Sequence, residues 1–113
     1  MNIFNLVEMI KERPGMYIAG QSATELDYFL RGFITAKKMV NNEPEDMESY
    51  YSFNHWVCKK LFIEANVSWR RAIAFQEPNE FYAFQKFFEL WGEFVLSGDN
   101  IMGEKTQNLE HIS

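Results

Sequence analysis

The chain has 113 residues, of which 47% are hydrophobic and 17% aromatic, which suits one globular domain with a single core. Its 16 acidic residues outnumber 11 basic ones, and the net charge of -5 disfavours direct binding to nucleic acid, because phosphate recognition needs a face rich in Lys and Arg. The single cysteine excludes an internal disulfide and no apolar run reaches the ~18 residues of a membrane span, so we expect a soluble, cytoplasmic protein that suits a basic partner.

The first predicted helix begins near the N-terminus. Four apolar residues fall at positions i, i+3, i+4 and i+7 and line one face: Ile3, Leu6, Val7 and Ile10. Pro14 ends this helix, because the residue before a proline avoids the α region. The next three residues, Met16-Tyr17-Ile18, are predicted to form a short extended segment.

A capping box predicts where the second helix begins. Ser22 supplies the capping oxygen and Glu25, three residues later, reaches back to the start of the helix. The helix runs to about Val40 and has an apolar face that includes Leu26, Phe29, Leu30 and Phe33. Gly32 lies inside it and costs roughly 1 kcal/mol relative to alanine. We therefore expect another backbone to pack closely against this glycine.

A polar, proline-containing loop over 41–46 leads into a third helix with the apolar face Tyr50, Phe53, Trp56, Val57 and Leu61. Ser68 caps a short fourth helix. A strand over Ala72–Phe75 is an open alternative, because short apolar runs do not reveal their period.

Asn79 is the predicted cap of the last long helix, and Gly98 is its left-handed terminator. The helix carries an aromatic and aliphatic stripe of Phe81, Phe84, Phe88, Trp91 and Val95, widened by Phe87 and Phe94. Such a width predicts a central helix that several others contact. Together the patterns predict a mainly α fold, a single-domain bundle of four to five helices over residues 1–98, with 99–113 as a loosely attached tail.

Two residue pairs resemble catalytic groups. His55 and Cys58 are three residues apart and share a helix face, as a base and a nucleophile or two zinc ligands would. Glu89 and Glu93 lie one turn apart, but on the polar side of the aromatic stripe. Catalysis needs an orienting group and zinc needs more ligands, and the chain supplies neither in a recognisable pattern. We expect no catalytic residue, metal or cofactor, and a small enzyme based on His55 and Cys58 remains an alternative.

The predicted partner-binding residues surround the acidic loop. They are Glu43, Glu45, Asp46, Glu48, Tyr50 and Tyr51. An acidic run is by default a solvated linker, but acids beside tyrosines suit docking onto a cationic surface. Replacing Glu45 by Gln together with Asp46 by Asn is therefore expected to weaken partner binding and to leave thermal unfolding nearly unchanged.

Several landmarks carry a family resemblance across about residues 3 to 95. They are Arg-Pro-Gly-Met-Tyr-Ile at 13–18, the spacing of Leu26, Phe29-Leu30 and Gly32, Phe53 with Trp56-Val57, Ser68-Trp69, and Phe87-Phe88-Glu89-Leu90. In this order they resemble small bacterial immunity proteins of contact-dependent growth-inhibition and polymorphic toxin systems.

The resemblance implies a protein that binds its cognate toxin domain one to one and blocks the active site or the approach of substrate. An acidic inhibitor matches a basic nuclease toxin, and an RNase of the EndoU type is the specific expectation. A homo-oligomeric adaptor protein is the alternative from another functional class.

Overall fold

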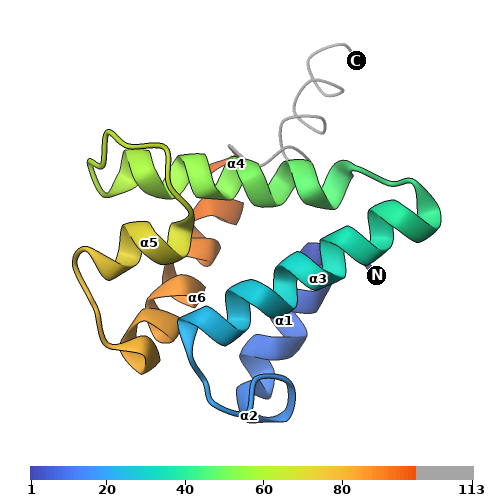
Figure 1. Ribbon diagram of the computed structural model, residues 1–113, viewed down its shortest axis with the longest axis horizontal. Coiled ribbons are helices and arrows are strands. Elements are labelled where there is room, and N and C mark those ends of the chain that lie inside the picture. Colours follow the sequence, from blue (N-terminus) through green and yellow to red (C-terminus); the bar gives the residue numbers. More distant parts are fainter. Residues whose placement is uncertain (99–113) are drawn as a thin grey trace.

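Six α-helices make up the computed structural model over residues 1–98, the part of the chain that it describes (Figure 1). The predicted tail over 99–113 lies outside the described residues. The helices are α1 (Ile3–Glu12), α2 (Pro14–Tyr17), α3 (Ala23–Asn41), α4 (Glu45–Lys60), α5 (Trp69–Ala74) and α6 (Glu80–Ser97). Residues 1–98 contain no strand, and the mainly α prediction is confirmed.

The predicted extended segment after Pro14 is wrong for two of its three residues. Met16 and Tyr17 belong to α2, a single helical turn, and only Ile18 is extended, with φ -123° and ψ 88°. Pro14 occupies the first position of this turn, where its fixed φ suits a helix and its missing N–H is not needed. The strand alternative is also excluded, because Ala72 to Ala74 lie in α5.

Side-chain caps fix the beginnings of α3, α5 and α6, as the sequence predicted. The hydroxyl of Ser22 accepts a hydrogen bond from the Glu25 amide at 3.0 Å, and Ser68 and Asn79 act in the same way for α5 and α6. The Glu25 carboxylate, however, accepts from the amide of Gly20 at 3.0 Å instead of closing the capping box. A Cβ at Gly20 would lie 2.5 Å from an oxygen of that carboxylate, so a larger residue there would displace the end of the Glu25 side chain.

The core forms where α4 crosses α6. The ring of Phe53 on α4 is fully buried, with its centroid 4.9 Å from that of Trp91 and 5.4 Å from those of Phe87 and Phe94. Edge-to-face contacts of this kind suit the charge distribution of aromatic rings. The helix α6 packs on α3, α4 and α5, which agrees with the predicted central position.

The buried stripe of α6 is turned relative to the prediction. Phe87 and Phe94, expected at its edges, are fully buried, whereas Phe81 and Val95 are 43% and 40% exposed. The reason is tertiary: the rings of Phe87 and Phe94 contact Phe53 of α4, and that of Phe87 also contacts Trp69 of α5. The expectation at Gly32 is likewise wrong, since a Cβ there would meet nothing within 4 Å.

The long helices α3 and α4 diverge from the loop that joins them, and α5 and α6 occupy the opposite, open end of the pair (Figure 1). Among the described residues, the side of α4 that carries Glu48, Tyr51 and His55 is exposed. Within residues 1–98, no helix has both the length and the apolar character required to cross a bilayer.

Candidate functional site

The exposed side of α4 and the loop before it carry four of the six predicted partner-binding residues. Glu45, Glu48 and Tyr51 are exposed, and Tyr51 keeps 59% of its accessible surface. Glu48, Tyr51 and His55 follow at i, i+3 and i+7, so they lie along one side of the helix. Glu43, in the preceding loop, has a half-exposed side chain. We call Glu43, Glu45, Glu48 and Tyr51 the acidic ridge.

Asp46 is not part of this surface. It is 4% exposed, and its Oδ2 lies 2.9 Å from Nζ of Lys37 on α3. Lys37 also reaches Oε2 of Glu43 at 3.3 Å and donates to the carbonyl of Met1 at 2.8 Å. The hydrogen bond to Asp46 raises the pKa of Lys37 against the opposing effect of burial. Asp46 therefore joins α3 to α4 and is not available to a partner.

Tyr50 is also buried, at 1% exposure. Its hydroxyl donates to Oδ1 of Asp27 at 2.6 Å and accepts from the indole N–H of Trp69 at 2.5 Å. Burial and the nearby Asp27 carboxylate raise the pKa of Tyr50, so the phenol stays protonated. The apolar face predicted for this helix included Tyr50, and that pattern was the signal that it belongs to the core.

The carboxylate of Asp27 is the centre of this buried polar cluster. It is 2% exposed, with Nε of Arg70 at 3.4 Å and Nη1 of Arg31 at 3.8 Å from its Oδ2. Two guanidinium groups thus compensate one buried charge, as buried carboxylates require. The sequence offered no signal for this role, because Asp27 lies inside an amphipathic helix like any other polar residue.

A hollow of about 420 Å³ opens beside the acidic ridge, between α3, α4 and the loop that follows α4. Tyr51, His55 and Asn66 contribute to its lining, and Asp27 lies at it with Arg31. Because Arg31 balances Asp27, the hollow is polar without a strong charge of its own. It extends the exposed surface that a partner can contact next to Tyr51.

Three of the four residues in the other candidate pairs interact within the fold. Cys58 is buried, and its Sγ lies 3.3 Å from the carbonyl oxygen of Val67 as donor, while the imidazole of His55 makes no hydrogen bond within residues 1–98. Glu89 pairs with Lys86 at 3.5 Å and Glu93 with Lys60 at 3.3 Å. In the described part of the chain, no three His, Cys, Asp or Glu side chains are grouped as metal ligands would be.

Comparison of the chain with protein families, with curated proteins and with solved structures finds no match. The resemblance to immunity proteins therefore stays a prediction, and a function must be inferred from the geometry.

Proposed function

We propose that this chain is an immunity protein, which binds a basic toxin domain one to one and neutralises it by covering its active site or its substrate path. One observation carries the proposal: three carboxylates and an exposed tyrosine lie together in the acidic ridge of a protein with net charge -5. A nuclease is the toxin class that fits, because it presents positive charge to the phosphates of its substrate. An RNase of the EndoU type is the specific proposal.

The ridge suits electrostatic docking because its acids are exposed and close together. Exposed charges accelerate the encounter of complementary surfaces and fix their orientation more than they add to final affinity. Tyr51 supplies a large amphipathic ring beside them, the kind of side chain that anchors an interface. The partner surface it fits is a cationic groove in which carboxylates take the place of phosphates.

The same acids also have a structural explanation. Glu45, Asp46 and Glu48 lie in the first turn of α4, whose N-cap residue Pro44 makes no side-chain cap. Negative charges at this end interact favourably with the helix dipole, by about 0.3–1 kcal/mol each. The test must therefore measure binding and stability separately.

The test uses a candidate toxin, a basic RNase domain of the EndoU type from a reading frame that neighbours the one for this chain. Association with it is measured for the natural protein and for Glu45→Gln/Glu48→Gln over a range of salt concentrations. The proposal expects an association rate that falls as salt rises, and a several-fold lower rate for the variant at low salt. The matched control is Glu8→Gln/Glu12→Gln, which removes two exposed carboxylates from α1. Equal rates for both variants, or no binding by the natural protein, would refute the proposal.

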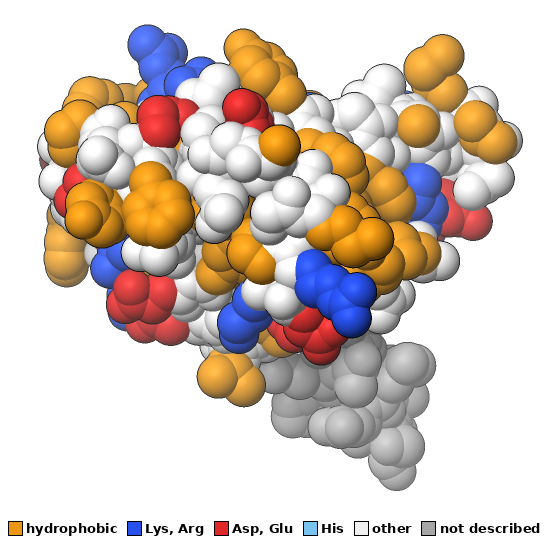
Figure 2. Space-filling view, turned by 90° about the horizontal axis from the view of Figure 1, so that it is seen from below, with side chains coloured by type: hydrophobic (Ala, Val, Ile, Leu, Met, Phe, Trp, Pro, Cys, Tyr) orange, Lys and Arg blue, Asp and Glu red, His pale blue; other side chains and the backbone are white. Residues whose placement is uncertain are grey.

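A homo-oligomeric adaptor is the second candidate, and the exposed apolar side chains favour it. Phe62, Leu96, Val40 and Met39 are each at least 80% exposed. In Figure 2, however, the apolar side chains on the face seen from below form separate patches between charged groups. Light scattering after size-exclusion chromatography decides this candidate: a monomer has a mass of 13.4 kDa, and a stable multiple of it would favour the adaptor.

A further inference from the structure

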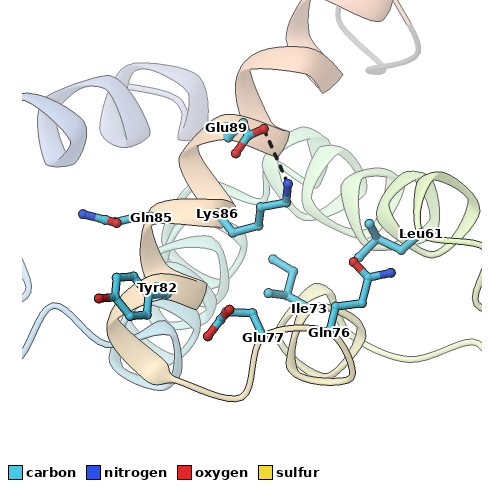
Figure 3. Close-up of a pocket in the computed structure, with 8 residues that line it drawn as sticks. All are labelled: Leu61, Ile73, Gln76, Glu77, Tyr82, Gln85, Lys86 and Glu89. Atoms are coloured by element: carbon cyan, nitrogen blue, oxygen red, sulfur yellow. Dashed lines mark hydrogen bonds and ion pairs between the residues drawn. The ribbon is translucent and has the colours of Figure 1, made fainter.

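A second hollow, of about 400 Å³, lies at the other end of α4 from the acidic ridge (Figure 3). Leu61, Ile73 and the ring of Tyr82 give it apolar walls from the end of α4, from α5 and from α6. Its other lining residues are polar: Gln76, Glu77, Gln85, Lys86 and Glu89. Tyr51, the ridge residue nearest in the chain, is ten positions before Leu61, which corresponds to about 15 Å along the helix at 1.5 Å per residue.

The charges in this hollow are not balanced. Nζ of Lys86 is 3.5 Å from Oε1 of Glu89, and Figure 3 shows the lysine extended toward that partner. Glu77 is half-buried and makes no ion pair or side-chain hydrogen bond within residues 1–98. A partly buried carboxylate of this kind gains most from an incoming cation, because its surroundings are less polar than water.

The segment that borders the hollow after Leu61 holds Phe62 in an unfavourable conformation. The Phe62 and Ile63 amides donate to the carbonyls of Lys59 and Cys58 at 3.2 and 2.8 Å, the two bonds of a Schellman C-cap. Phe62 has φ 58° in the position that glycine normally takes, and its side chain is 93% exposed. Left-handed backbone is unfavourable for an L-residue, because its Cβ lies too close to the following carbonyl oxygen, and the exposed ring gives little packing in return. A gain in the stability of the fold therefore does not explain why a phenylalanine occupies position 62.

A second exposed ring precedes the hollow on α5. Phe75 is 69% exposed and is followed by Gln76, which lines the hollow. Two large aromatic side chains thus extend into solvent from positions next to Leu61 and Gln76, which line the hollow together with the unpaired carboxylate of Glu77. Aromatic rims around a recess are typical of protein interfaces.

We propose that this hollow binds an arginine side chain of a basic protein partner. The aliphatic part of the arginine lies against Leu61 and Ile73, its guanidinium meets Glu77, and Phe62 closes the recess from its rim. Arginine fits better than lysine, because its planar cation stacks on aromatic rings and bonds a carboxylate with two parallel N–H groups. The inference depends on the proposed function only in taking a basic protein as the partner.

The test needs no toxin. The ¹⁵N-labelled protein is titrated with the peptide acetyl-Leu-Arg-Leu-amide, and amide shifts are followed by NMR. The matched peptide has citrulline, a neutral isostere, in place of arginine. We expect saturable shifts at Ile73, Glu77 and Tyr82 with the arginine peptide alone. The Glu77→Gln variant should bind about fivefold more weakly, whereas Glu64→Gln, which removes an exposed acid outside the hollow, should bind like the natural protein.

A Phe62→Gly variant gives a second, independent result. It relieves the left-handed backbone, so its thermal unfolding should shift upward while its peptide binding weakens. A structural role for Phe62 predicts the opposite sign of the stability change.

Three outcomes would overturn the inference. They are equal binding of the citrulline peptide, arginine-peptide shifts unchanged by Glu77→Gln, and shifts in the hollow that appear on concentrating the protein without peptide, which would identify a second copy as the occupant. This titration does not measure binding at the acidic ridge, so the inference and the proposed function can fail separately.

Discussion

The hydroxyl of Tyr50 lies 2.6 Å from Oδ1 of Asp27, so a buried hydrogen bond joins α4 to α3. The same hydroxyl accepts from the indole of Trp69 at 2.5 Å and adds α5 to the connection. Tyr51, the next residue, is 59% exposed and lies in the acidic ridge. One step along a helix turns the side chain by about 100°, so two adjacent tyrosines have opposite roles.

Replacing Tyr50 by Phe should destabilise the fold by about 1–3 kcal/mol, because it leaves Asp27 and the Trp69 indole with buried, unpaired polar groups. Urea unfolding followed by tryptophan fluorescence measures the change. Tyr51→Phe is the matched control and should stay within about 0.5 kcal/mol of the natural protein. Equal stabilities for the two variants would show that the Tyr50 hydrogen bonds do not support the fold.

Asp46→Asn should also destabilise, because it breaks the 2.9 Å ion pair with Lys37. A hydrogen bond to a charged group contributes about 1.5–3 kcal/mol, and Glu43 remains near Lys37 to compensate part of the loss. The expectation that Glu45→Gln with Asp46→Asn leaves unfolding unchanged therefore does not suit this structure. Chemical unfolding of each single variant checks this: Glu45→Gln should change stability by less than 1 kcal/mol or so, the range of a helix-dipole effect.

Gly32→Ala should stabilise the protein by up to about 1 kcal/mol. The position is exposed on α3, and a Cβ there meets no atom within 4 Å, so alanine improves the helix without a clash. An upward shift in thermal unfolding is the expected result. A downward shift would mean that an atom outside the described residues, or a partner, contacts this position.

Glu80 should make the stability of the fold depend on pH in the acidic range. Burial acts to raise its pKa, but hydrogen bonds from Thr24, including one from its amide at 2.8 Å, together with Ser22 and the charge of Arg70, leave the net pKa lowered. A carboxyl with a lowered pKa stabilises the fold above its unfolded value of 4.5, and this contribution disappears as the pH falls below that value.

Unfolding of Glu80→Gln and of the natural protein should therefore differ slightly at neutral pH and converge in acid. The effect is small because Glu80 is exposed and solvent screens it. Glu8→Gln, on an exposed face of α1, is the control and should follow the natural protein at every pH. A difference between Glu80→Gln and the natural protein that persists well below pH 4.5 would contradict the assignment.

The sequence predicted the candidate site only in part. The acidic run and both tyrosines were found from composition and spacing, and four of the six residues lie on an exposed surface: Glu43, Glu45, Glu48 and Tyr51. The other two, Asp46 and Tyr50, pair with residues that are 9 and 23 positions away in the chain. No local sequence pattern predicts such pairs, because each depends on how α3 and α4 cross.

The sequence by itself determined the helices and most of their ends. Caps such as Ser22 and Asn79, the break at Pro14 and the left-handed Gly98 act through neighbouring backbone atoms, so their effect can be read within a few residues. Only the tertiary structure decided which charges remain free. Lys37 neutralises Asp46 and Lys86 turns to Glu89, while Glu45, Glu48 and Glu77 keep unpaired carboxylates within residues 1–98. Electrostatic pairing depends on distances in space, and the packing of α3, α4 and α6 sets those distances.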